Sequence, residues 1–183
     1  MLQSVRGATT PTSTSTSGGT TTTTTQAAVQ QALPQVRQAF STFRSGYSTD
    51  VQDVLYQADA SGNINPSNNR AAFDARVAND LATLDSNLRT ALANVPNNAT
   101  LLSQVDAAVV GTDANGLQGQ LKGLTTPSGG AYSLSSRLFN ASSNIAIGGA
   151  EREVTSLIAN SAGGSTSGRG GFLSSLFGGH RFF

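Results

Sequence analysis

An apolar stripe between Asn65 and Val95 constrains the fold of this chain more than any other feature of its sequence. Large apolar side chains recur there at steps of three and four residues: Phe73, Val77, Leu81, Leu84, Leu88, Leu92 and Val95. That spacing places them on one face of an α-helix. Asn65 and Pro66 are typical of a helix start. The side-chain oxygen of Asn65 can accept a hydrogen bond from a free backbone N–H of the first turn, and Pro66 has no backbone N–H that would need a partner there. The stretch therefore predicts an amphipathic helix whose apolar face needs a partner.

The other side of this predicted helix carries its charges. Asp85 precedes Arg89 by four residues, an order that stabilises a helix by roughly 0.2 to 0.5 kcal/mol. The remaining charged residues on this side are Asp74, Arg76 and Asp80. We therefore expect a helix on the surface of its domain, with one side in contact with water.

Two more long segments show helical spacing. In residues 26–58 the apolar positions are Val29, Leu33, Val36, Phe40, Phe43, Tyr47, Val51, Val54 and Ala58. Pro34 predicts a kink or a restart there, and Gly46 predicts a second break. In residues 131–160 they are Leu134, Leu138, Ala141, Ile145, Ala150, Val154 and Ile158, with a kink or two shorter helices expected at Gly148 and Gly149. Shorter helical segments are expected between residues 100 and 124.

These patterns predict an all-α fold for residues 26–160, either an elongated antiparallel helical hairpin or a small up-down helical bundle. Residues 1–25 end in a Thr/Ser tract that offers no apolar face, so we expect a disordered linker there. A glycosylated stalk is the alternative, and it needs a secreted protein. Residues 161–183 read as a Gly/Ser-rich linker followed by an apolar tail.

The tail supplies the candidate functional residues, because it is strongly apolar although it follows a polar linker. Its large apolar side chains are Phe172, Leu173, Leu176, Phe177, Phe182 and Phe183. The first four share one helical face, and burying each would stabilise a contact by about 1.5 to 3 kcal/mol. We expect these residues to dock on a partner protein or on a neighbouring copy of the chain. The alternative is that the tail packs on its own bundle.

Composition excludes several classes of function. The net charge is +1 and charged residues make up 11% of the chain, so no basic stripe is available to bind nucleic acid. The absence of cysteine removes thiolate metal sites and cysteine nucleophiles. No apolar run is long enough for a membrane span, and no apolar core follows residues 1–7 to form a signal peptide.

Catalytic motifs are also missing from the sequence. The single histidine, His180, lies in the Gly-rich tail, where no partner would fix it as a general base. Residues 57–68 resemble a calcium loop at Asp59 and Gly62, but Gln57 and Asn68 replace its first and last carboxylates, so we expect a plain turn between helices. We therefore expect no enzyme activity, no metal, no cofactor and no small-molecule substrate.

Charge-poor helices rich in Ala, Asn, Gln, Ser and Thr, without Cys or Trp, are similar to helical parts of bacterial surface and filament-forming proteins. That resemblance implies a non-catalytic structural or interaction module of a bacterial surface or extracellular assembly, and we expect this location in preference to the cytoplasm. The alternative is an intracellular helical adaptor whose C-terminal apolar tail docks a partner protein.

Overall fold

The predicted all-α fold is confirmed by a computed structural model, which describes residues 19–96, 98–126 and 135–162. Its helices are α1 (Gly19–Asp50), which continues into a π-helical turn η1 (Val51–Leu55), then α2 (Pro66–Leu92), α3 (Asn98–Val110), α4 (Leu117–Leu124) and α5 (Ser136–Ser161). The described residues contain no β-strand beyond one isolated bridge between Ala58 and Ile64.

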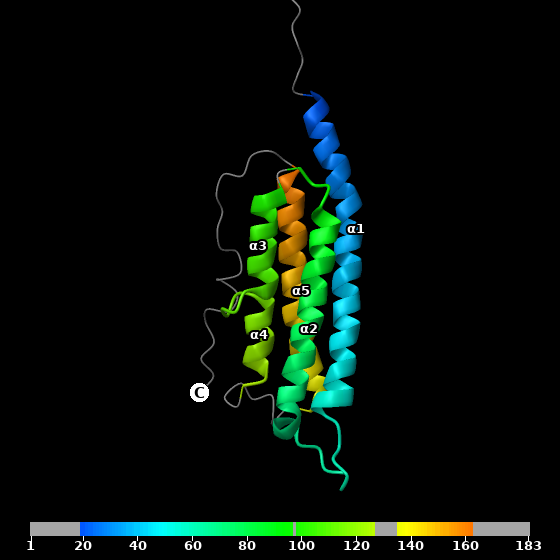
Figure 1. Cartoon of the computed structure of the whole chain (residues 1–183), viewed down its shortest axis with the longest axis vertical. Coiled ribbons are helices and arrows are strands. Elements are labelled where there is room, and N and C mark those ends of the chain that lie inside the picture. The colour runs from blue at the N-terminus through cyan, green and yellow to red at the C-terminus, as the bar shows by residue number, and fades with distance from the viewer. Residues whose placement is uncertain (1–18, 97, 127–134, 163–183) are drawn as a thin grey trace, which may run out of the picture.

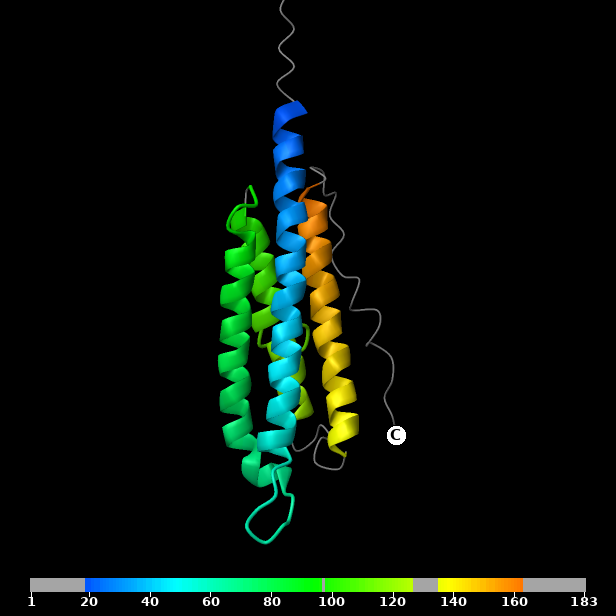
Figure 2. The same cartoon turned by 90° about the vertical axis from the view of Figure 1, so that its right-hand side faces the viewer.

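The helices form an up-down bundle (Figures 1 and 2). α1 and α2 run antiparallel, α3 and α4 lie end to end as one arm, and α5 returns alongside them. α5 packs on α1, α3 and α4, so the two ends of the described chain belong to neighbouring helices. The small bundle, rather than the helical hairpin, is therefore the architecture, because α5 and the α3–α4 arm complete the cover of the α1–α2 pair.

The apolar stripe of α2 faces the interior, as its spacing predicted. Every one of its side chains is buried, and Leu84, Leu88 and Leu92 are among the largest fully buried side chains of the described residues. Asn65 caps the helix by accepting from the backbone N–H of Ser67 at 3.1 Å. This agreement follows from a stripe in which an apolar residue occupies each inward position from Phe73 to Val95, about six turns at 3.6 residues per turn.

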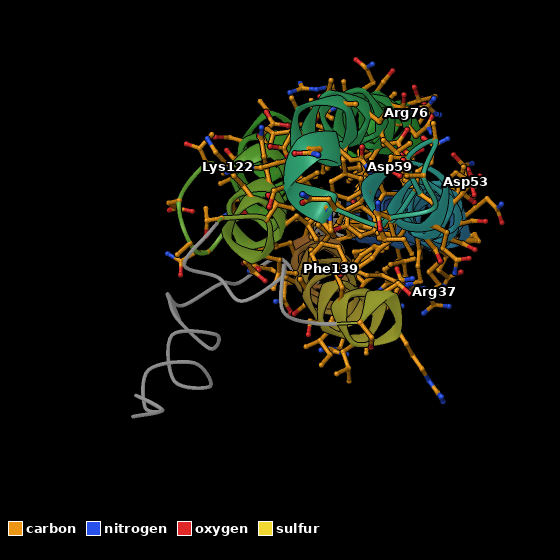
Figure 3. All side chains as sticks on the ribbon, turned by 90° about the horizontal axis from the view of Figure 1, so that it is seen from below. Arg37, Asp53, Asp59, Arg76, Lys122 and Phe139 are labelled. Atoms are coloured by element: carbon orange, nitrogen blue, oxygen red, sulfur yellow. The ribbon has the colours of Figure 1, made fainter. Side chains whose placement is uncertain are left out.

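Aromatic rings join the helices at one end of the interior. The Tyr47 and Phe73 rings meet edge to face with centroids 5.5 Å apart, and the Phe73 and Phe139 rings do so at 6.2 Å. Figure 3 looks along the bundle and shows Phe139 directed inward, while Arg76 and Lys122 lie near the rim. The contacts link α1, α2 and α5, so three segments far apart in sequence share one core.

α1 differs from its prediction in its start and its continuity. It begins at Gly19 instead of Gln26, and its first turns extend beyond the other helices (Figure 2). Pro34 lies inside α1 without ending it, so the predicted restart is wrong. Ala32 and Val36 are buried on either side of this exposed proline, and their packing offsets the hydrogen bond that proline lacks.

The break in the first segment occurs after Gly46, at the π-helical turn. There the backbone N–H of Tyr56 donates to the carbonyl of Val51 at 3.0 Å, one residue further back than in an α-helix. Val51, Val54 and Leu55 are all buried in this turn, so it continues the inward apolar face of α1. Ala58, predicted to be inward, is exposed in the loop that follows.

α5 corrects the last predicted stripe. The helix is unbroken from Ser136 to Ser161, so the alternative of two shorter helices meeting at the two glycines is wrong. Its buried face carries Phe139, Ser143, Ala146, Ile147, Ala150, Val154 and Ile158. Leu138, Ala141 and Ile145 instead face solvent, and Leu134 lies outside the described residues. Phe139 decides which side of α5 faces the interior, because its larger side chain gains more from burial than that of Leu138.

Candidate functional site

The six apolar side chains predicted to dock a partner all belong to residues 172–183, which lie outside the described residues. The docking role of Phe172, Leu173, Leu176, Phe177, Phe182 and Phe183 therefore remains a prediction.

Large apolar side chains are exposed at three positions of the described residues. They are Ile64, in the loop before α2, with 57% of its surface exposed, and two residues of α5, Leu138 at 55% and Ile145 at 62%. Leu138 and Ile145 are seven residues apart, so they lie on the same side of α5, with exposed Ala141 between them. We call Leu138, Ala141 and Ile145 the outer stripe of α5.

The outer stripe exists because α5 has apolar residues on two sides of its first half. Phe139, Ala146 and Ile147 fill the inner side. No charged residue lies between Leu138 and Ala150, so the outer side is interrupted only by small polar residues. The stripe can therefore make an apolar contact without removing a charge from water.

An open hollow of about 800 Å³ lies between α1 and α2. Small polar and charged side chains line it: Gln38, Ser41, Thr42, Ser45, Thr49, Asp50, Arg76, Asn79 and Asp80, together with Gly46. The lining includes no large apolar or aromatic side chain, the residue types on which small-molecule sites usually depend.

Three charged groups meet in this hollow. The side chain of Asp50 is 10% exposed and accepts a hydrogen bond from Arg76 Nη1 at 3.3 Å. Asp80 has a buried carboxylate oxygen, Oδ2, without a hydrogen-bond partner. Burial, followed by the charge of Asp50, raises the pKa of the Asp80 carboxyl above its ordinary value. The Asp80 carboxyl can therefore hold a proton more readily than an exposed aspartate.

This cluster is poorly suited to hold a metal ion or a cofactor. Arg76 already balances the charge of Asp50, and a hard cation usually takes six or more oxygen ligands. Across the part of the chain that the structure describes, no three His, Cys, Asp or Glu residues converge on a common point. What the arrangement can do is bind and release a proton between α1 and α2.

A second hollow of about 630 Å³ lies on the other side of α1, toward α5. Its lining is again polar, and it shares Ser41, Ser45 and Thr49 with the first. Arg44 closes one side by donating to Glu151 at 2.8 Å across the α1–α5 contact. The polar residues of α1 thus separate two hollows, and the arginine that lines each of them is held in an ion pair.

The loop between η1 and α2 is organised around Asp59. Its Oδ1 atom accepts from the backbone N–H groups of Ser61 at 2.8 Å and Asn63 at 2.9 Å. The Asn63 hydrogen bond and then that of Ser61 lower the pKa of this carboxyl. Gly62 adopts φ of 81°, which favours glycine. The single carboxylate of the calcium-like stretch therefore holds the turn together.

Sequence reasoning missed both features of the described surface. Asp50 and Asp80 lie on different helices, and the spacing of residues along one helix does not predict which residues of another helix lie beside them. The outer stripe does have a signal in the sequence, since Leu138 and Phe139 are adjacent large apolar residues that compete for the same inward position.

None of the helices in the described ranges combines the length and the apolar character needed to cross a membrane. The chain matches no known family model, no curated protein and no solved structure.

Proposed function

We propose that this protein is a non-catalytic structural or interaction module that makes protein contacts through exposed apolar surface. The observation that supports this most directly is the outer stripe, where Leu138 and Ile145 are more than half exposed on one side of α5. Large exposed aliphatic side chains grouped on one helix face are typical of protein contacts. The apolar residues between 172 and 183 are the second contact that we propose, on the strength of their sequence.

The polar hollows give little support to an enzyme. Both of their arginines are paired, Arg76 with Asp50 and Arg44 with Glu151, and neither hollow contains a histidine or a cysteine. The low charge of the chain also gives no electrostatic attraction for nucleic acid. A helical module rich in small polar residues fits a surface or extracellular assembly, the location that its composition suggests.

Sedimentation over a hundredfold dilution series tests the proposed contact. We expect the full chain to associate as its concentration rises, and a chain ending at Gly171 to stay monomeric, because it lacks the C-terminal apolar residues. If both chains stay monomeric and the shorter one is less stable, the tail belongs to its own bundle. Fractionation of the producing cells then separates a surface module from an intracellular adaptor.

A further inference from the structure

We propose that the outer stripe of α5 binds the apolar C-terminal segment, residues 172–183, of a second copy of this chain. The two α5 helices would lie antiparallel, and each copy would give its segment to the other. This inference rests on the proposed function and names both the surface and the partner through which the chain associates.

The two surfaces match in length. Leu138 and Ile145 are separated by seven residues, or about 10 Å along the helix axis. In the segment, Phe172, Leu173, Leu176 and Phe177 recur at the spacing of one helical face, which would extend over about 8 Å. The segment could therefore place two turns of apolar side chains against the two turns of the stripe.

The two surfaces also match in charge over the residues proposed to touch, 138–150 and 172–177; Arg181 lies beyond them, near the end of the segment. The stripe has no charged residue between Leu138 and Ala150, and the segment has none between Gly170 and Gly179. Their contact would bury apolar area without stripping water from an ion. Ser and Asn side chains between the apolar positions of α5 leave room for large rings from the segment.

Chain length points to a second copy rather than to the same chain. α5 ends at Ser161, at the opposite end of the bundle from its first turns (Figure 1). Ile145 lies about 24 Å from that end along the axis, and Leu138 about 35 Å. The ten residues 162–171 reach about 33 to 36 Å only at full extension, and a Gly/Ser-rich chain of that length averages about 17 Å. The same chain would cover the stripe only in a stretched state.

Antiparallel packing removes this cost. When two α5 helices lie side by side in opposite directions, the last turn of one is beside the first turns of the other, at the usual helix spacing of about 8 to 10 Å. Each linker then crosses a distance well below its average span. The arrangement is two-fold symmetric and closes as a dimer with two identical contacts. Once one contact has formed, the second forms within the same complex and therefore at a high effective concentration.

Sedimentation of matched variants tests the contact. The variants are L138S with I145S, truncation at Gly171, and both changes together. We expect the stripe variant and the truncation each to raise the dimer dissociation constant at least about tenfold, and the combination to raise it no further than either alone. The control is I64S, which replaces an aliphatic side chain of similar exposure (57%) away from the stripe and should leave the constant unchanged.

Crosslinking identifies which copy supplies the segment. The chain has no cysteine, so A141C can be placed on one copy and S175C on another without background. We expect a disulfide-linked dimer when the two variants are mixed and oxidised. A chain carrying both changes that forms only an internal disulfide, with no linked dimer from the mixture, would show that the segment folds back on its own α5 and would overturn the proposal.

The outcomes separate this inference from the proposed function. If truncation abolishes association but the stripe variant behaves like wild type, the tail still mediates association and the stripe is not its receptor. If truncation has no effect on association, the proposed role of the tail is wrong as well. Additive effects of the two changes would also overturn the inference, because they would place the segment and the stripe in separate contacts.

Discussion

The hydroxyl oxygen of Tyr47 lies 3.1 Å from Oγ of Ser143, and this contact joins α1 to α5 inside the bundle. Ser143 donates its own hydrogen to the carbonyl of Phe139 at 2.9 Å, so Tyr47 is the donor to Ser143. Burial raises the pKa of Tyr47 well above its usual range, so the phenol stays protonated and able to donate. One serine therefore satisfies two buried polar groups.

This direction of donation makes the two partners unequal. Tyr47→Phe removes a donor and leaves Ser143 bonded to Phe139, so we expect a loss of about 0.5 to 1.5 kcal/mol in unfolding free energy. Ser143→Ala leaves a buried hydroxyl without an acceptor, and should cost about 1 to 3 kcal/mol. In urea unfolding, the double variant should be close to Tyr47→Phe alone. A double variant with the sum of both losses would contradict the assigned donor.

Leu84 tests the central stripe of α2. Its side chain is 1% exposed, so Leu84→Asp would place an unpaired charge in the core and should remove several kcal/mol of stability. Ala82→Asp is the matched control, because residue 82 is exposed on the same helix. We expect the first variant to lose cooperative thermal unfolding by circular dichroism and the control to keep it. Equal melting curves would mean that the stripe does not face the core.

Asp80 should make stability depend on pH. Its pKa is raised above the ordinary value of 3.8, first by burial and then by the charge of Asp50, so the folded state binds the proton more tightly than the unfolded state. The resulting loss of stability begins as the pH rises past the pKa of Asp80 in the unfolded chain. It is complete above the raised pKa of Asp80 in the folded protein. Asp80→Asn lacks this ionisation and should melt higher than wild type at neutral pH.

Melting temperatures of both proteins between about pH 2.5 and pH 8 check this sign. The advantage of Asp80→Asn should shrink as the pH falls and should disappear below the unfolded value, where both side chains are neutral. If the variant melts lower than wild type at neutral pH, the attraction of Arg76 outweighs the burial of the Asp80 carboxylate.

The extent to which the sequence predicts the fold differs between α2 and α5 for a physical reason. In α2, large apolar residues occupy one face and polar residues the others, so only one phase buries the stripe. In α5, Leu138 and Phe139 are neighbours and both are large and apolar, so two phases compete. The tertiary contact of Phe139 with Phe73 selects one of them, and that contact depends on the packing of another helix.

The same reason limits prediction of the polar cluster. Asp50 and Arg76 meet because the loop and the π-helical turn between α1 and α2 set the register of the two helices. Hydrophobic spacing does not encode that register to within one turn. The C-terminal docking residues could be proposed from sequence alone, since they are apolar in a polar context, but the stripe that we assign to them required the orientation of α5.

Gly119 and Gly123 lie four residues apart on α4, and glycine has a low helix propensity at either position. The structure separates them. A Cβ atom at Gly119 would overlap the backbone carbonyl of Asp113, whereas a Cβ at Gly123 would have no neighbour within 4 Å. Backbone cannot give way as a side-chain end can, so alanine at the first position must displace the turn before α4.

We therefore expect opposite effects from the same substitution. Gly119→Ala should lower the unfolding free energy by more than about 1 kcal/mol, because it disrupts the Gly119 N–H to Gly111 carbonyl hydrogen bond of 3.2 Å. Gly123→Ala should raise it by up to about 1 kcal/mol, since alanine loses less backbone entropy in a helix. Urea unfolding of the two variants compares them directly. A gain for both would show that the turn at Asp113 moves freely and that α4 is limited by helix propensity alone.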